Sequence, residues 1–242
     1  MFNQYPNQSR YGAPGRTADR AAFDDGLRRH MLRVYNFMTL GLGVTGLVAF
    51  FVASTPALYV PIFTTPLKWV VMLAPLAFVF VLSWRFDRMS PSALQATFWA
   101  FCAAMGLSMA SIFLVFTGAS VARVFFITAS MFAATSLWGY TTKRDLTGMG
   151  SFLMMGLIGI VIAGLVNIFI GSSAIQFAIS VIGVVVFTGL TAYDTQNIKE
   201  SYAEHYGADA NTKLAVMGAL SLYLNFINLF QMLLNLMGQR EE

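Results

Sequence analysis

Seven apolar runs of about 20 residues, separated by short polar segments, constrain the fold of this chain more than any other feature. A helix needs about 20 apolar residues to cross a bilayer, so each run is long enough to span one. Charged residues make up 11% of the chain, whereas about a quarter of a soluble domain is charged. The sequence therefore predicts an all-α integral membrane protein with seven transmembrane helices. The predicted spans are Val34–Thr55, Leu67–Trp84, Leu94–Phe116, Ala122–Tyr140, Gly150–Ile170, Ala174–Thr195 and Leu214–Met237.

The basic residues predict the orientation of these spans. Twelve of the fifteen Lys and Arg residues fall on the side of the N-terminus, and Lys68, Arg123 and Arg240 fall on the other. Because Lys and Arg are enriched in cytoplasmic loops, we expect a cytoplasmic N-terminus and an external C-terminus. If the last run re-enters the membrane instead of crossing it, the C-terminus moves inside. The net charge of +4 thus reflects topology and does not indicate a nucleic-acid partner.

The predicted membrane domain, residues 23–238, lies between two polar tails. We expect residues 1–22 to form a disordered, basic cytoplasmic tail and residues 239–242 a short polar one. The chain carries no HExxH, GxSxG, P-loop or EF-hand pattern. Its single cysteine, Cys102, excludes an intrachain disulfide and a CxxC site. We therefore expect no enzymatic activity, no cofactor and no tightly bound metal.

The last apolar run carries a polar stripe. Its members are Ser221, Asn225, Asn228 and Asn235, at steps of four, three and seven. On a helix these positions fall within an arc of about 80°. Because the bilayer offers no hydrogen-bond partners, such a face must point toward protein or a water-filled cavity. We therefore expect the other helices to pack around this one.

Asp194 is the one acidic residue within an apolar run. A carboxylate near the bilayer centre costs about 2.5–3.5 kcal/mol, so such residues commonly mark a proton or ion route. Alternatively, it lies at the cytoplasmic end of its span, partly hydrated and bonded to Thr191, Thr195 or a neighbouring helix. These threonines and Thr188 follow helical spacing and give the span a hydroxylated face. That face favours a polar interior shared with the stripe of the last run.

Three segments resemble the bacterial branch of the Bax-inhibitor family, the transmembrane Bax inhibitor motif proteins. They are Thr191–Ile198 (TAYDTQNI), Ala219–Phe230 (ALSLYLNFINLF) and Gly139–Phe152 (GYTTKRDLTGMGSF). The resemblance covers residues 23–238. It implies a seven-helix fold in the bacterial inner membrane, with the C-terminal helix central and wrapped by the other six. It also implies a calcium-permeable, pH-sensitive leak, controlled by two aspartates that share a proton.

The first of these aspartates corresponds to Asp194, but the second corresponds to Asn225. Two close carboxyls cannot both ionise easily, which is how such a pair senses pH. Asn225 cannot titrate, and its amide can donate a hydrogen bond that favours the ionised form of Asp194. The sequence therefore predicts weaker or acid-shifted pH control than in a relative with paired acids.

Arg85, at the end of the second span, is the predicted cationic partner of Asp194 and would hold the cytoplasmic side closed. Arg88 or Lys199 could take that place, and Arg85 could equally be an ordinary flanking arginine of the cytoplasmic side. The predicted lining of the ion route is Asn225, Asn228, Ser221 and Thr191. Because calcium prefers six to eight oxygens, we expect Asp194 to contact a cation only in transit.

Two functions follow from these features. The first is a calcium or other cation leak with Asp194 at its gate. The second is a non-conducting regulator that binds a membrane-anchored ATP-dependent protease through the arginine-rich N-terminal tail. The polar interior favours the leak.

Overall fold

The computed structural model describes residues 14–203 and 207–240, with side chains from residue 23 onward. Most of the described residues are helical. The elements are α1 (Pro14–Ala53), α2 (Pro56–Thr64), α3 (Leu67–Arg85), the 3-10 turn η1 (Phe86–Arg88), α4 (Pro91–Met109), α5 (Ile112–Val115), α6 (Gly118–Thr141), α7 (Thr147–Ile170), α8 (Ser173–Ser201) and α9 (Gly207–Met237). Seven segments are long and apolar enough to cross a membrane, which confirms the predicted all-α class and the seven spans.

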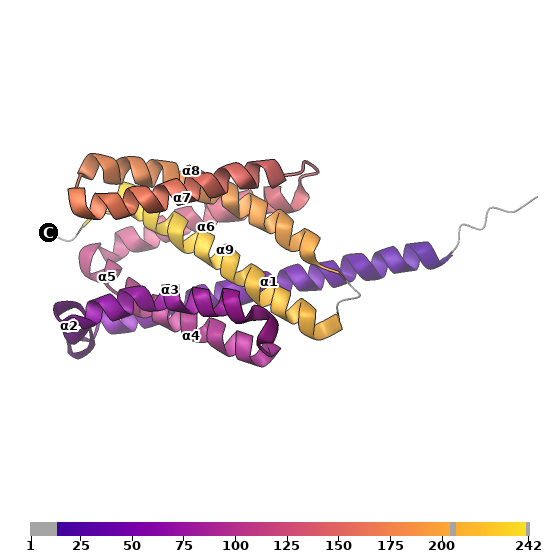
Figure 1. Cartoon of the computed structure of the whole chain (residues 1–242), viewed down its shortest axis with the longest axis horizontal. Helices are drawn as coiled ribbons and strands as arrows, with labels where there is room; N and C mark the ends of the chain where they lie inside the picture. Colours follow the sequence, from indigo (N-terminus) through magenta and orange to yellow (C-terminus); the bar gives the residue numbers. More distant parts are fainter. Residues whose placement is uncertain (1–13, 204–206, 241–242) are drawn as a thin grey trace, which may run out of the picture.

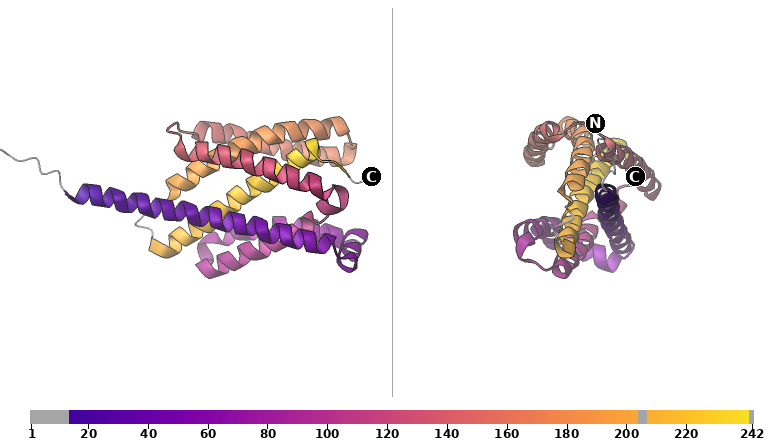
Figure 2. Two further views of the ribbon diagram at one scale, coloured as in Figure 1. Left: turned by 180° about the vertical axis from the view of Figure 1, so that it is seen from behind. Right: turned by 90° about the vertical axis from the view of Figure 1, so that its right-hand side faces the viewer.

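Helix α9 occupies the centre of the bundle. It crosses diagonally between a layer formed by α7 and α8 and a layer formed by α1, α3 and α4 (Figure 1). Its main neighbours are α8, α1, α6 and α4, while α3 packs chiefly on α4 and α7 on α8. The end-on view in Figure 2 shows α9 between the two groups of helices. The predicted central position of the C-terminal helix is confirmed.

Contacts at its two ends show that α9 runs the full height of the bundle. At one end, Lys213 Nζ donates to the carbonyl oxygen of Asp87 over 3.2 Å. At the other, just beyond the helix, the backbone N–H of Gln239 donates to Ser120 Oγ over 2.9 Å. Its 31 residues make a helix about 46 Å long, longer than a hydrocarbon core of about 30 Å. The last segment is therefore long and apolar enough to cross the membrane completely. Helix α1 begins at the end of the bundle opposite to the one where α9 ends (Figure 1).

Several helix boundaries differ from those expected from the sequence, most clearly at α1 and at the third predicted span. Helix α1 begins at Pro14, so residues 14–22 of the expected disordered tail are helical, while residues 1–13 lie outside the described residues. The third predicted span is broken into α4 and α5 at Ala110 and Ser111. At this break Ala110 N–H bonds to the carbonyl of Leu107, and Ser111 Oγ donates to the carbonyl of Ser108. Such side-chain bonds to the backbone compete with the helical ladder.

Glycine permits the closest helix contacts, as expected where lipid gives no hydrophobic drive between helices. A Cβ atom at Gly139 of α6 would collide with the backbone of Ala192 on α8, and one at Gly106 of α4 would lie 2.7 Å from the carbonyl oxygen of Thr45 on α1. Other glycines of the spans face open space instead: Gly43, Gly46, Gly159 and Gly164. Close packing is therefore confined to particular helix pairs.

Candidate functional site

The carboxylate of Asp194 on α8 is bound by two side chains of α9. Its Oδ2 accepts hydrogen bonds from Ser221 Oγ over 2.6 Å and from Asn225 Nδ2 over 2.7 Å. The two donors lie one helical turn apart, so both reach the same oxygen. The predicted contact between Asp194 and the polar stripe, including the bond from the Asn225 amide, is confirmed.

The surroundings of this cluster differ on its two sides. Asn225 is buried, whereas Asp194 and Ser221 are partly exposed. The Oδ1 atom of Asp194 makes no hydrogen bond to any residue that the structure describes. One oxygen is therefore held by protein donors while the other can accept a cation or a proton. Hydrogen bonds to a charged acceptor contribute about 1.5–3 kcal/mol each, enough to offset the cost of about 2.5–3.5 kcal/mol for a carboxylate near a bilayer centre.

The rest of the stripe does not touch Asp194. Asn228 donates its amide N–H to the carbonyl of Leu224 on its own helix over 2.8 Å, and Asn235 is exposed. One face of α9 nevertheless carries a row of partly exposed and exposed residues, which are Met217, Ser221, Leu224, Asn228, Gln231, Met232 and Asn235. The stripe is thus on the least covered face of the central helix.

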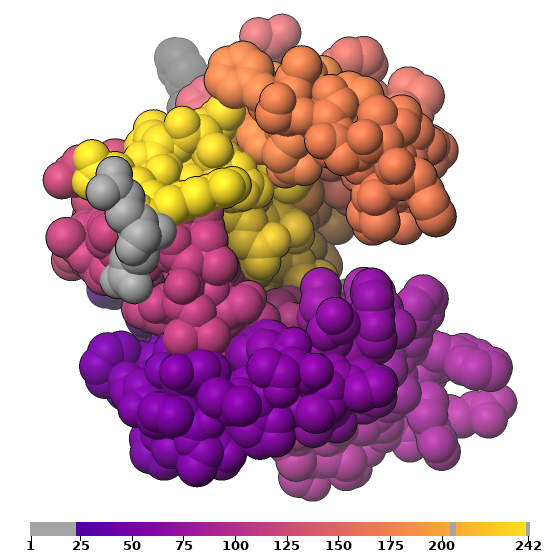
Figure 3. Space-filling view, turned by 90° about the vertical axis from the view of Figure 1, so that its left-hand side faces the viewer, coloured from indigo at the N-terminus to yellow at the C-terminus, as the bar shows by residue number. Residues whose placement is uncertain are grey.

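The space beside this face opens at the end of the bundle that carries the C-terminus. Figure 3 shows the molecule hollowed there between α8, in orange, and the purple segment around α3, with residues of α9 at the bottom of the hollow. The helices that flank this hollow belong to the two separate layers of the bundle. The hollow therefore lies between the two layers, over part of α9.

Thr191 does not contribute a free hydroxyl to the cluster. Its Oγ1 donates to the carbonyl of Phe187 over 2.8 Å, and the side chain is completely buried. Thr195 Oγ1 donates to the carbonyl of Thr191, while Thr188 Oγ1 is buried without a partner in the described part of the chain. The threonine face of α8 therefore adjoins Asp194 in sequence but bonds mainly to its own helix.

The predicted pairing of Arg85 with Asp194 is not present. Arg85 is exposed at the end of α3 and lines a polar cavity of about 410 Å³ with Arg88 and Asp87. The reason is the layering, because α3 packs on α2 and α4 and not against α8. Lys199, the other expected substitute, donates its Nζ to the carbonyl of Tyr140 over 2.9 Å. No cationic latch therefore joins Asp194 within residues 14–203 and 207–240.

Two buried hydroxyl contacts were not predicted. Tyr35 of α1, Ser136 of α6 and Thr195 of α8 form a chain, with oxygen separations of 2.6 Å and 2.9 Å. The hydroxyls of Tyr223 on α9 and Thr45 on α1 lie 2.6 Å apart. Each contact joins residues that are more than 50 positions apart, so spacing along the chain gives no signal for it. Buried hydroxyls nonetheless require a partner, which the neighbouring helices supply here.

The described residues contain no group of three or more His, Cys, Asp or Glu side chains placed to hold a metal ion. A cation at Asp194 would meet one carboxylate together with hydroxyl and amide oxygens. Calcium held tightly requires six to eight oxygen ligands, so this arrangement is suited to brief contact.

Comparison with known proteins places the whole bundle within one family of sequences. The family model described as inhibitor of apoptosis-promoting Bax1 matches residues 27–242. The inner membrane protein YbhL of Escherichia coli K12 is 46% identical over 218 residues, which cover 89% of this chain and 93% of YbhL. An uncharacterized protein of Rickettsia prowazekii is 46% identical over 226 residues, covering 93% of this chain and 96% of the relative. Both similarities cover most of each chain.

Proposed function

This chain belongs to the Bax inhibitor family, and from that premise we propose that it is a cation leak pathway, with calcium as its ion, in the bacterial inner membrane. The similarity to the inner membrane protein YbhL supports the location. The proposed orientation has the N-terminus in the cytoplasm, as the distribution of Lys and Arg favours.

The observation that carries this proposal is the carboxylate of Asp194, of which only one oxygen accepts hydrogen bonds from the described residues. Two donors on the central helix hold Oδ2, which leaves Oδ1 to meet a cation. From this point the polar stripe continues along α9 through Asn228 to Asn235. The helix ends at the end of the bundle where Figure 3 shows the hollow. A charged side chain inside a membrane is energetically costly, so such a residue commonly marks an ion route or pairs with another group. The stripe supplies the route on one side of Asp194.

The other side of Asp194 is closed by apolar packing. Ile198 lies one helical turn beyond Asp194 on α8 and is buried. Its side chain packs on Gly218 of α9, where an added Cβ would lie 3.1 Å from Ile198. The proposed closed state therefore has its barrier at Ile198 and Gly218, between Asp194 and the end where α1 begins. Ile198→Ala should raise the leak, and Ile179→Ala, a buried isoleucine of α8 far from this contact, is its control.

The proposed pathway has weak pH control, because Asn225 cannot share a proton with Asp194. Replacing Asn225 by aspartate would put a second carboxyl where the amide now lies 2.7 Å from Oδ2. Two carboxyls at that distance cannot both ionise, so the pair would take up a proton as the pH falls. Asn225→Asp should thus create the pH response that the natural residue omits.

The test is calcium flux into dye-loaded proteoliposomes between about pH 6 and 8, the range where a carboxyl pair is expected to exchange its shared proton. We expect a steady leak from the native protein, background flux from Asp194→Asn, and a pH-dependent leak from Asn225→Asp. Asn235→Asp is the matched control, since it adds a carboxyl to the same stripe away from Asp194. The leak proposal fails if the native protein conducts no more than empty liposomes.

The alternative function, a regulator of a membrane-anchored ATP-dependent protease, has one supporting observation. Helix α1 projects beyond the ends of the other helices where it begins (Figure 1), so a partner could bind that extension without touching the bundle. Deleting residues 1–20 should remove such a regulatory effect and leave the leak unchanged. If the deletion abolishes the effect on the protease while Asp194→Asn changes neither that effect nor the calcium flux, the result would favour the regulator.

A further inference from the structure

A long apolar groove separates α1 from α6 on the side of α9 that is opposite to Asp194. Helices α1 and α6 lie side by side with α9 behind them (Figure 2, left), but they make few direct contacts. The groove between them has a volume of about 750 Å³, with Met31 and Met38 on one wall, Ala133 on the other and Phe226 of α9 at its floor. We call this space the α1–α6 groove. Its volume is typical of a site for a small ligand.

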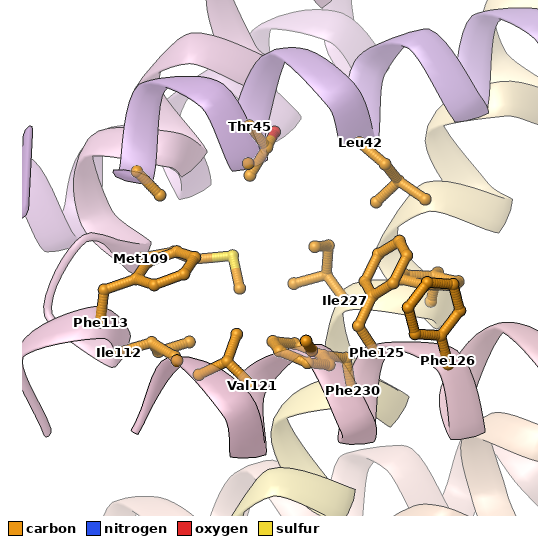
Figure 4. A pocket seen from close by; sticks show the side chains of 15 residues that line it. Leu42, Thr45, Met109, Ile112, Phe113, Val121, Phe125, Phe126, Ile227 and Phe230 are labelled. Atoms are coloured by element: carbon orange, nitrogen blue, oxygen red, sulfur yellow. The ribbon is translucent and has the colours of Figure 1, made fainter. Parts of the chain in front are cut away.

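The groove leads into a deeper apolar cavity of about 280 Å³. The two spaces share Leu42, Phe125 and Phe226. In Figure 4 the labelled side chains of α1, α6 and α9 point toward this cavity from opposite sides. Thr45 is the only polar side chain in the lining, and its hydroxyl is already bonded to the Cys102 carbonyl and to Tyr223. An occupant of the deeper cavity must therefore be largely hydrocarbon.

A cationic side chain lies at the end of the groove away from the deeper cavity. Arg28 of α1 lines the mouth, is exposed, and has no hydrogen bond or ion pair to any residue whose side chain is described. Within the groove, the hydroxyls of Tyr35 and Ser136 bond to each other over 2.6 Å. The polar end of an occupant would thus find its partner at the mouth. Along the walls, Thr39 and Tyr140 also line the groove, and the remaining lining is mostly apolar.

The depth of the groove matches one leaflet of a bilayer. Arg28 and Leu42 are 14 residues apart, which corresponds to about 21 Å along the helix axis. Half of a hydrocarbon core is about 15 Å, and each headgroup region adds about 5–7 Å. A lipid whose phosphate lies at Arg28 would therefore reach the bottom of the groove with the end of its acyl chain.

We propose that the α1–α6 groove binds one anionic phospholipid, with its phosphate at Arg28 and one acyl chain between α1 and α6 over Phe226. The chain fills an apolar space that would otherwise lose dispersion contacts on one side. The negative headgroup neutralises the arginine, which attracts anionic lipid at a membrane surface. The lipid completes the wall of the bundle where α1 and α6 do not meet.

The first test fills the groove. The full chain in detergent is titrated with phosphatidylglycerol, and bound lipid is counted by native mass spectrometry. Ala133→Trp places an indole in the groove, and Ala134→Trp is the control, since Ala134 is exposed on the same helix but does not line the groove. We expect one tightly bound phospholipid on the native protein and on Ala134→Trp, and its loss from Ala133→Trp. Equal binding by both variants would overturn the proposal.

The second test removes the charge without changing the packing. Arg28→Gln should lower the preference for phosphatidylglycerol over phosphatidylcholine of the same chain length about fivefold, the effect of one arginine at a lipid surface. Arg29→Gln, a neighbouring exposed arginine that does not line the groove, should leave the preference unchanged. An equal loss of lipid preference in both variants would show that general surface charge causes the effect, and it would overturn the specific site.

The third test locates the lipid. A phosphatidylglycerol with a photoreactive group in its acyl chain is incorporated into proteoliposomes of the full chain, and labelled peptides are mapped. Labelling of α1 and α6 should fall in Ala133→Trp while labelling of the lipid-facing α7 stays constant. A uniform change over all three helices would contradict the proposal. So would a dimeric native mass that carries no lipid, because a second copy would then occupy the groove.

Discussion

The two opposite faces of α9 lie in different surroundings, although one continuous helix carries both. On one face, Ser221 and Asn225 donate hydrogen bonds to the carboxylate of Asp194. On the other, Phe226 packs against the rings of Phe125 and Phe132, with centroids 5.5 Å and 5.6 Å away. The polar face is held by a specific partner on α8, whereas the aromatic face is the floor of a groove that protein does not fill.

We infer from this difference that the two faces of the central helix have different roles. Hydrogen bonds are directional, so a polar face in a membrane fixes the register of the neighbour that supplies its acceptor. Apolar packing is not directional, and hydrocarbon from the bilayer can substitute for a helix. In the proposed function, the polar face governs ion passage and the aromatic face governs stability. Substitutions on each face should separate the two properties.

The largest expected change in stability comes from the aromatic face. Phe226→Ala removes a buried ring and should lower the free energy of unfolding by about 3–5 kcal/mol. Calcium flux through the folded fraction should stay at the native level, because the side chain does not contact Asp194. Thermal unfolding in detergent and flux in proteoliposomes give the two values. A flux as low as that of Asp194→Asn would show that the faces are not independent.

A smaller change in stability is expected from Tyr223, which makes the polar contact of the aromatic face. Tyr223→Phe removes the hydroxyl that lies 2.6 Å from Thr45 Oγ1, and the loss of one buried hydrogen bond lowers stability by about 1 kcal/mol. Thr45 keeps its bond to the Cys102 carbonyl, which limits the effect. Denaturant titration provides the measurement, with Tyr59→Phe, on the short α2, as a control that should change little.

The polar face should contribute still less to stability. Asp194→Asn keeps an oxygen that can accept from Ser221 and Asn225, and it removes a charge whose insertion costs about 2.5–3.5 kcal/mol. The loss of charge-assisted bonds, about 1.5–3 kcal/mol each, opposes that gain. We expect a net change within about 1 kcal/mol together with complete loss of flux. Severe destabilisation by this variant would show that Asp194 serves the fold and not passage.

The smallest effect is expected outside both faces, in the loop between α6 and α7. The side-chain hydrogen bond from Thr147 to Asp145, followed by the backbone bond, lowers the pKa of this exposed carboxyl below its ordinary value. A lowered pKa in the folded state stabilises the protein above the unfolded pKa, and that contribution is lost as the pH falls through the folded pKa. Thr147→Val should slightly reduce the acid sensitivity of unfolding below about pH 4. Thr141→Val, at an exposed threonine that bonds only to its own helix, should not.

The comparison of the two faces also shows what could be predicted from the sequence. The spacing of Ser221 and Asn225 defined one side of a helix, and Asp194 was the charge available to meet it, so their contact was predictable. The pairing of Arg85 with Asp194 was wrong, because flanking charge indicates the side of the membrane but not the neighbouring helix. The hydroxyl chain through Tyr35 and Ser136 gave no signal, since three separate helices contribute to it.

By itself, the sequence determined the helical class, the number of spans, the polar face of α9 and the presence of a residue that cannot titrate, Asn225, on that face. Each of these depends on local periodicity or on the chemistry of a single side chain. Only the tertiary structure decided that α3 lies away from Asp194, that Ile198 packs on Gly218, and that α1 and α6 stay apart over Phe226. Lipid favours no particular pairing of apolar helix faces, so these outcomes depend on the close fit of the whole bundle.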